Sequence, residues 1–119
     1  MRDFVKASKA LSDETRLRIL NLLLERECCV CEVMQALQIS QTRASRNLSI
    51  LRNAGFLKLH KDGLWSLYSL DEEDMDEYMK GLVESVRTAM AKNQLAAIDR
   101  DRLKRAERVG PGCAGKLAR

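Results

Sequence analysis

The sequence predicts a small, mainly α domain that carries one β-hairpin. Apolar residues recur at helical spacing along most of the chain from Phe4 to Met90. Two short runs, 56–60 and 64–70, are rich in strand-forming residues and flank Lys61-Asp62-Gly63, whose Asp-Gly pair is typical of a hairpin turn. The 119 residues are close to the size of one domain, and 45% of them are hydrophobic, enough for one modest core.

The first two helices are predicted from apolar spacing and from a helix-start signal. Phe4, Ala7 and Leu11 share one helical face. Ser12 then offers a hydroxyl to the free amides of a new first turn, and the acids that follow it suit the positive end of a helix. The leucine-rich segment 15–24 carries too many apolar residues for one stripe, so we expect this second helix to be buried on most sides.

The next two helices and the hairpin form a recognisable motif. The third helix is predicted to begin near Val30, and Ser40 is a good N-cap for a fourth helix over about 41–53. The apolar stripe of this fourth helix, which we expect to face the core, comprises Ala44, Leu48 and Leu51. Two short helices joined by a tight turn, the second of them polar and basic and followed by a hairpin, predict a winged helix-turn-helix.

The end of the chain is predicted to be one long helix and a tail. The acidic cluster 71–77 suits the start of a helix. One apolar stripe follows: Met75, Tyr78 with Met79, Leu82, Val83 with Val86, and Met90. This stripe is covered either by the same helix of a second copy or by its own domain. We expect a DNA-binding and dimerisation domain over 1–98, which dimerises through terminal helices, and a flexible basic tail over 99–119.

Local charge is more informative than the net charge of +4. Residues 40–61 carry five basic side chains and no acidic one, and residues 87–119 carry nine basic and three acidic ones. A basic block within a folded domain favours nucleic acid as a partner over a plain solvated surface. The major groove of duplex DNA admits one helix, whose polar side chains read bases and phosphates. The expected DNA-contacting residues are Ser40, Gln41, Thr42, Arg43, Ser45, Arg46, Ser49 and Lys61.

The sequence also indicates the compartment. It contains no apolar run near the ~18 residues that a membrane helix needs, and its first residues lack the apolar stretch of a secretory signal. We therefore expect a cytoplasmic protein. In a reducing compartment, clustered cysteines are more often ligands or redox groups than structural disulfides.

Three of the four cysteines lie at the start of the third helix: Cys28, Cys29 and Cys31. Thiolates prefer thiophilic ions, and a helix N-terminus lowers the pKa of a thiol. Residues two apart do not share a face of a regular helix, so one ion bound by both Cys29 and Cys31 is expected to distort the first turn. The alternative is a small buried hydrophobe, and it is stronger for Cys28 than for the other two. Cys113, in the glycine-rich tail, is either an extra ligand or a spectator.

Other uses of these cysteines are disfavoured. A tetrahedral zinc site is not expected, because the only histidine is His60 in the hairpin and no Cys-x₂-Cys pair is present. A thiol enzyme is not expected either, because no cysteine of the cluster is followed by an arginine in a Cys-x₅-Arg arrangement. No glycine-rich anion loop accompanies the cluster. Oxidation of neighbouring thiols remains a possible switch.

Five segments of the chain, taken in order, resemble the arsenical-resistance repressor family (ArsR/SmtB type), over roughly residues 4–92. The matching segments are ALSDETRLRIL (10–20), ECCVCEV (27–33), SQTRASRNL (40–48), LRNAGFL (51–57) and GLWSLY (63–68). The resemblance implies a homodimeric winged-helix repressor on a palindromic operator of double-stranded DNA, from which a toxic metal or metalloid releases it.

The Cys-Val-Cys element is similar to that of trivalent arsenic and antimony sensors, which implies that Cys29 and Cys31 are the core ligands. The family's usual third cysteine is replaced here by Met34, so Cys28 and Cys113 remain alternatives for a third ligand. The family's second site, of Asp and His on the last helix, has no counterpart because residues 71–98 contain no histidine. We therefore expect no zinc site on that helix.

The expected function is a cytoplasmic transcriptional repressor rather than an enzyme. Trivalent arsenic or antimony is the expected inducer, and no organic cofactor is expected. Two alternatives remain open: a repressor of the same fold that responds to cadmium or lead, and one that responds to thiol oxidation.

Overall fold

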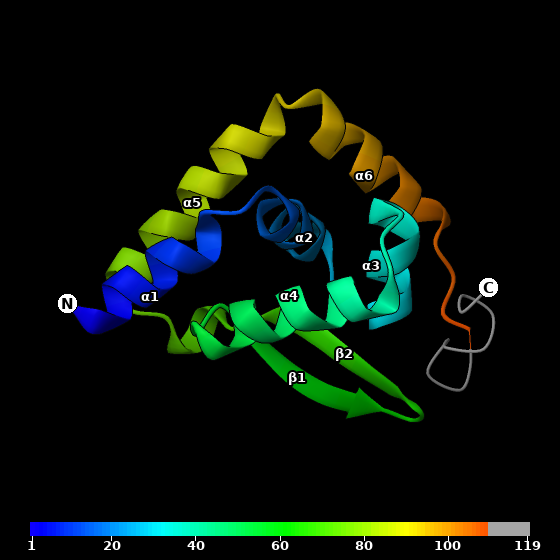
Figure 1. Cartoon of the computed structure of the whole chain (residues 1–119), viewed down its shortest axis with the longest axis horizontal. Coiled ribbons are helices and arrows are strands. Elements are labelled where there is room, and N and C mark those ends of the chain that lie inside the picture. The colour runs from blue at the N-terminus through cyan, green and yellow to red at the C-terminus, as the bar shows by residue number, and fades with distance from the viewer. Residues whose placement is uncertain (110–119) are drawn as a thin grey trace.

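The computed structural model describes residues 1–109 and shows the expected helical domain with one hairpin (Figure 1). The elements in chain order are α1 (Arg2–Leu11), α2 (Glu14–Glu25), α3 (Val30–Leu37), α4 (Gln41–Asn53), β1 (Leu57–Asp62), β2 (Trp65–Leu70), the 3₁₀ turn η1 (Glu72–Asp74), α5 (Glu77–Ala91) and α6 (Gln94–Arg105). Residues 110–119, with Cys113, lie outside the described residues. Within the described part, no helix is long and apolar enough to cross a membrane.

The helix starts follow the capping chemistry of the sequence, with one shift. Ser40 caps α4 as expected, because its side chain accepts a hydrogen bond from the Arg43 amide. The cap of α2 is Asp13 rather than Ser12, since the Asp13 carboxylate accepts from the Arg16 amide at 3.0 Å. Ser12 ends α1 instead, and its hydroxyl donates to the carbonyl of Ser8 at 2.8 Å.

The hairpin forms as expected, but its turn lies at Gly63 and Leu64, because Lys61 and Asp62 belong to β1 rather than to the turn. β1 and β2 are antiparallel, with Leu57 opposite Leu70 and Asp62 opposite Trp65. Gly63 has a φ of +62° in the turn, a conformation that glycine adopts at low cost. The backbone of Cys28 also pairs with Tyr68, through N–H···O distances of 3.0 and 2.8 Å. The segment before α3 is therefore hydrogen-bonded directly to the wing.

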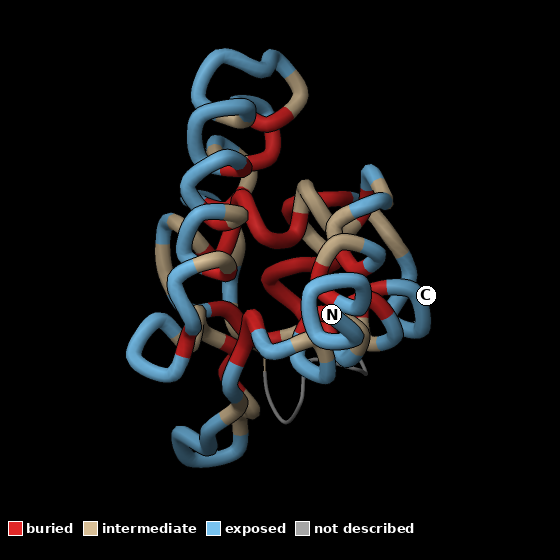
Figure 2. The backbone as a smooth tube through the Cα atoms, turned by 90° about the vertical axis from the view of Figure 1, so that its left-hand side faces the viewer, coloured by how far each residue is buried: buried red, intermediate tan, exposed pale blue. Residues whose placement is uncertain are grey.

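The core lies where α2, α4 and the start of β1 meet. Phe56, Leu20, Leu48 and Leu51 are fully buried there, and each contributes roughly 1.5–3 kcal/mol by leaving water. The apolar stripe of α5 covers part of the same core, with Met79 and Val83 buried, so this stripe packs at least partly on its own domain. Figure 2 shows the buried residues on the inward faces of the helices and the exposed residues outside.

The expected single long helix is wrong, because the structure divides it. The acidic cluster forms η1, and α5 begins only after Asp76. A second break follows α5, where the side chain of Asn93 accepts from the Ala96 amide and caps the new helix α6. In Figure 1, α5 and α6 form the two sides of an arch over α2.

The expected tail from residue 99 is also wrong over residues 99–105, which belong to α6. This helix contacts both α2 and α3. Asp99 and Leu103 are buried, and Asp99 accepts two hydrogen bonds from the Arg18 guanidinium, at 2.8 and 2.9 Å. Asn21 reaches the same helix, donating to the Ala96 carbonyl at 3.1 Å. The packed domain thus includes residues that composition alone assigns to a tail.

Candidate functional site

The start of α3 brings Cys29 and Cys31 together. Cys29 is the N-cap of α3, with an extended backbone (φ −88°, ψ 169°), and Cys31 lies in the first turn. Because the N-cap residue is outside the helix, the two side chains converge, and their Sγ atoms are 3.0 Å apart. The two sulfurs are thus already close without any distortion of α3, and the distortion expected when one ion is bound by both stays a prediction. Two sulfurs on one ion with bonds of about 2.3 Å lie roughly 3.3–3.8 Å apart, so a small separation suffices.

This thiol pair (Cys29 and Cys31) is buried. Their exposed fractions are 2% and 0%, and they pack with Leu67, Trp65 and Val109 in a small apolar cluster apart from the main core. Burial raises the pKa of the Cys29 thiol above its ordinary value, and the hydrogen bond from the Glu32 backbone amide offsets only part of this rise. The expected lowering of the pKa by the helix N-terminus is thus outweighed by desolvation.

Glu32 organises the polar side of the thiol pair. Its buried carboxylate accepts from the Cys29 amide at 2.9 Å, from Arg26 at 2.6 Å and from Arg108 at 3.0 Å. Burial alone raises the pKa of this carboxyl, but these three donors lower it to a net value below the ordinary one. Glu32 is therefore held as a carboxylate that fixes the start of α3.

Cys28 is placed differently from its two neighbours. It is fully buried in the main core, and its Sγ donates to the Arg26 carbonyl at 3.5 Å. Burial, with a smaller effect of the Glu32 charge, raises the pKa of Cys28 to about 12. Among the described residues, no group of three or more His, Cys, Asp or Glu side chains is arranged to hold a metal ion. Cys28 is thus placed as a small buried hydrophobic residue, which is the alternative role that the sequence indicates for it.

The raised pKa of Cys28 predicts a loss of stability at alkaline pH. The folded state keeps this thiol protonated, so its stabilising contribution is complete below the ordinary pKa of 9.0 and is lost as the pH rises toward 12. Each pH unit in this window is expected to cost up to about 1.4 kcal/mol. Urea unfolding of the reduced protein at a series of pH values measures the slope. Cys28→Ala should lose stability less steeply than the wild type, and parallel slopes would contradict the assignment.

The expected DNA-contacting residues lie on α4 and at the hairpin tip. Most of them are exposed, Ser45 is half-buried, and the exposed members are Ser40, Gln41, Thr42, Arg43, Arg46, Ser49 and Lys61. The Ser40 hydroxyl is engaged in the helix cap. Arg43 also donates to the Thr15 hydroxyl at 2.9 Å, so part of its guanidinium is anchored to α2. The structure therefore presents a polar, basic helix face with the hairpin beside it.

Two residues that support this face were not expected from the sequence. Arg16 donates to the Ala10 carbonyl at 2.6 Å and to the Asn47 side chain at 3.0 Å, which joins α1, α2 and α4. Asn47 in turn donates to the Arg43 carbonyl at 2.9 Å. Both are polar residues with structural partners, and apolar periodicity carries no signal for such contacts.

A second set of unexpected residues covers the thiol pair. Residues 106–109, which we call the strap, follow α6 and pass over the start of α3. The Glu107 carbonyl lies 3.8 Å from the Cys31 Sγ, and the Trp65 indole donates to the Val109 carbonyl at 3.4 Å. The sequence gives no sign of the strap, because its residues look like part of a charged tail.

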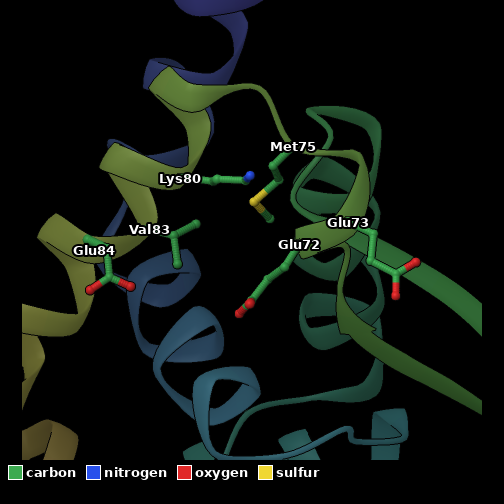
Figure 3. A pocket seen from close by; sticks show the side chains of 6 residues that line it. All are labelled: Glu72, Glu73, Met75, Lys80, Val83 and Glu84. Carbon is green, nitrogen blue, oxygen red and sulfur yellow. The ribbon is translucent and has the colours of Figure 1, made fainter.

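A hollow of about 490 Å³ lies elsewhere, between η1 and α5 (Figure 3). Its lining combines three carboxylates, one lysine and two apolar side chains: Glu72, Glu73, Glu84, Lys80, Met75 and Val83. It contains none of the expected ligand or DNA-contacting residues. We assign it no part in the candidate site.

Comparison with known proteins gives a consistent result. Residues 13–58 match the family described as "Bacterial regulatory protein, arsR family". The chain is 46% identical over 83 residues to the cadmium resistance transcriptional regulatory protein CadC homolog of Staphylococcus aureus, covering 69% of this chain and 65% of that protein. It is 32% identical over 77 residues to the arsenical resistance operon repressor of Bacillus subtilis, covering 64% of this chain and 73% of that one.

The fold is similar to that of solved regulators. The homodimeric winged helix-turn-helix DNA-binding domain Mb0332 of Mycobacterium bovis superposes with a TM-score of 0.64 at 26% identity, covering 78% of this chain and 82% of that one. The chain spans just under two thirds of the length of the S. aureus relative. These matched proteins are described as regulators or a DNA-binding domain, not as enzymes.

Proposed function

This chain belongs to the ArsR family of bacterial regulatory proteins, and on that premise we propose that it is a transcriptional repressor released from its operator by trivalent arsenic or antimony. The observation that carries the proposal is the thiol pair at the start of α3, with its sulfurs 3.0 Å apart. The naming of the B. subtilis relative as an arsenical resistance operon repressor supports the choice of inducer.

The burial of the thiol pair favours arsenite over a bare cation. Arsenous acid is uncharged at neutral pH, and each protonated thiol that replaces one of its hydroxyl groups releases one water molecule. The proton of the S–H bond leaves with the hydroxyl group, so no net charge is buried and no oxidant is needed. A site in which burial raises the pKa of Cys29 therefore suits this exchange. A divalent cation instead requires the thiols to lose their protons to solvent.

We assign the third ligand to Cys113 rather than to Cys28. Val109 packs against the thiol pair, and four residues of extended chain reach at most about 14 Å, enough to bring Cys113 to the same place. Cys28 would have to leave the main core, where its side chain is fully buried. Cys113→Ser should therefore weaken the response to arsenite more than Cys28→Ala does.

The contacts around the pair offer a route from ion binding to DNA release. Separation of the two sulfurs moves the backbone at Cys29, next to the Cys28 backbone that pairs with Tyr68 of β2. The same movement acts on the Glu32 carboxylate, which accepts from the Cys29 amide. The contact of Cys28 with Tyr68 connects the site to the wing. The contact of Cys29 with Glu32 connects it to α3, which packs against α4. Both DNA-contacting parts are thus coupled to the site.

We propose that the repressor is a homodimer formed through α1 and α5. Phe4 and Val5 are large apolar residues that are 47% and 40% exposed on α1. The Phe4 ring meets Tyr78 of α5 edge-to-face, with centroids 5.5 Å apart. A second copy of this surface would cover these residues, and the homodimeric state of the M. bovis domain supports that arrangement.

The proposed DNA surface predicts a change in salt dependence. Lys61→Ala removes one phosphate contact from each protomer, so the slope of log affinity against log salt should become less steep by about 1.8 for a dimer. The measurement uses fluorescence anisotropy with a duplex that the protein selects from a randomised pool. Lys92→Ala, which removes an exposed lysine between α5 and α6, is the matched control and should leave the slope unchanged. If Lys61→Ala has the same salt slope as Lys92→Ala, Lys61 does not contact DNA.

The central test measures release of the same duplex by arsenite. The reduced wild-type protein should dissociate, whereas the Cys29→Ser/Cys31→Ser variant should bind the duplex and stay bound. Cys28→Ala is the control for loss of a cysteine in the same segment, and it should still respond. Release of the double-serine variant by arsenite would show that the site is elsewhere.

A second candidate function is a cadmium response, which the 46% identity to the S. aureus cadmium regulator favours. A third is a thiol-oxidation response, which the short distance between the two sulfurs favours. Cadmium, arsenite and peroxide are therefore compared on one DNA complex. Release by peroxide that a dithiol reductant reverses, without release by arsenite, would support oxidation instead.

A further inference from the structure

Two adjoining hollows separate α4 from the helices α1 and α2, which both pack against it. The first, of about 440 Å³, lies between α1, the start of α2 and the end of α4. The second, of about 370 Å³, lies between the start of α2 and the first three turns of α4. Arg16 and Ile50 line both hollows. The two therefore form one groove along α4, which we call the flank groove.

The flank groove is strongly basic. Its charged lining residues in the described part of the chain are five cations and one acid: Lys6, Lys9, Arg16, Arg43, Arg46 and Asp13. The Asp13 carboxylate is already engaged, because it accepts from the Arg16 amide as the cap of α2. Lys6 and Lys9 are exposed, and within the described residues neither forms an ion pair. Their positive charge is thus available to a partner.

The shape of the flank groove is fixed by Arg16. Its Nε donates to the Ala10 carbonyl at 2.6 Å, one terminal nitrogen donates to the Asn47 side chain at 3.0 Å, and the other donates to the Lys9 carbonyl at 3.3 Å. One guanidinium therefore holds all three helices at the groove. Lys6 and Lys9 are three positions apart and share one face of α1. The two ammonium groups consequently extend from one rigid wall.

The arrangement of the charges suits a polyanion. The cations follow α4 along two hollows instead of converging on one point, as they would around a small anion. Arg43 and Arg46 also belong to the helix face that carries the expected DNA contacts, so the flank groove continues that face towards α1. A duplex that places its major groove on a helix carries its phosphate backbone along the sides of that helix.

We propose that the flank groove binds the sugar-phosphate backbone of operator DNA beside α4, with Lys6 and Lys9 as phosphate contacts and Arg16 as the residue that positions them. The proposal rests on the proposed function only in that the chain binds DNA, and it does not depend on the inducer. Phosphates are the same in every sequence, so these contacts add affinity and fix the position of α4 without choosing bases.

The test measures the DNA affinity of the full-length, reduced Lys6→Ala/Lys9→Ala variant by fluorescence anisotropy, with the selected duplex and with an unrelated duplex. Removal of two phosphate contacts per protomer should make the slope of log affinity against log salt less steep by about 3.6 for a dimer. At about 0.1 M salt, affinity should fall about tenfold or more, by the same factor for both duplexes. Ethylation interference should show phosphates that matter to the wild type and not to the variant.

The matched control is Lys92→Ala/Lys104→Ala, which removes two exposed lysines from the region of α5 and α6 and should leave the slope unchanged. Lys6→Arg/Lys9→Arg keeps both charges and should bind within about threefold of the wild type. Because α1 also carries Phe4 of the proposed dimer surface, sedimentation velocity is measured on every variant. If the double alanine variant forms less dimer, the single variants Lys6→Ala and Lys9→Ala decide the result, with a slope change of about 1.8 each.

Unchanged affinity and salt slope in a dimeric Lys6→Ala/Lys9→Ala variant would overturn the proposal and leave the flank groove to an acidic protein. Weakened binding of the selected duplex alone would also overturn it, because it would indicate contacts with bases. Failure of the proposed function gives different results. If arsenite does not release DNA but the variant weakens binding to both duplexes, the flank groove stands and the inducer is wrong. If the wild type binds neither duplex, both proposals fail.

Discussion

Arg18→Met is expected to lower the free energy of unfolding by about 3–5 kcal/mol, because it leaves a buried carboxylate without its partner. Asp99 is 0% exposed, and both of its oxygens accept from the Arg18 guanidinium, at 2.8 and 2.9 Å. The hydrogen bonds to Asp99 also raise the pKa of Arg18, so the arginine is charged at any accessible pH. A loss of this size is a large part of the ~5–15 kcal/mol that stabilises a typical domain.

Replacement of both partners is expected to be far less harmful. Arg18→Met/Asp99→Leu removes the buried charge together with its partner, so its stability should be near that of the wild type. Urea unfolding at one fixed protomer concentration measures both variants, since dimerisation would otherwise contribute. Arg105→Ala is the matched control: it breaks an ion pair with Asp101 on the same helix whose members are 68% and 59% exposed. Its effect should stay within about 0.5 kcal/mol.

This comparison separates two explanations for the docking of α6. If the double replacement is as unstable as Arg18→Met, the bidentate geometry itself holds α6 on α2. If all variants match the wild type, the helix is held by Leu103 and its apolar neighbours, and the ion pair contributes nothing.

Cadmium and arsenite are expected to differ sharply in the pH dependence of their binding. Burial raises the pKa of Cys29, so this thiol is protonated across the neutral range and must lose its proton to bind a divalent cation. Loss of this one proton from Cys29 should strengthen apparent cadmium binding by about tenfold per pH unit. Arsenous acid exchanges hydroxyl for thiol with release of water, so its affinity should be nearly flat between pH 6 and about 8.

The measurement is a titration of the reduced protein with each ligand at several pH values, in buffers that do not bind cadmium. The absorption of the thiolate-to-metal bond reports cadmium, and competition with DNA reports arsenite. Cys29→Ser/Cys31→Ser should abolish both signals. A flat cadmium profile would show that Cys29 is already ionised near neutrality, which contradicts its raised pKa. A steep arsenite profile would contradict exchange with protonated thiols.

Much of the fold follows from local rules in the sequence. The Ser40 cap, the stripe on α4 and the presence of a hairpin each depend on residues within a few positions of one another, and the structure confirms them, with the turn one residue later than expected. The start of α3 near Val30 is confirmed for the same reason. Local hydrogen bonding and apolar spacing therefore suffice to place most of the helix-turn-helix.

The second half of α6 could not be recognised in this way. The buried residues of this helix are Ala96, Asp99 and Leu103. A charged residue therefore lies in the middle of the buried face, where an apolar residue is the usual signal of burial. The partner that makes this burial possible, Arg18, is 81 positions away in the sequence. A method based on apolar periodicity counts both residues as surface charges, and so it assigns the segment to a tail.

The candidate site was predicted in its residues but not in its geometry. The cysteine cluster and its position at the start of a helix were visible in the sequence. The separation of Cys28 from the thiol pair was not visible in the sequence, because it depends on the pairing of the Cys28 backbone with Tyr68, 40 positions later. The strap was not visible either, because Gln35 and Glu107 are polar residues whose contact leaves no periodic pattern.

The position of Cys29 just outside α3 has a consequence for protein engineering. The backbone change from extended to helical between Cys29 and Cys31 is what a helix start typically provides. A Cys-x-Cys tripeptide whose first residue is the N-cap should therefore be transplantable. Placed at the first turn of an unrelated helical scaffold, with a carboxylate three positions after the first cysteine, it should bring two sulfurs together without remodelling the host backbone.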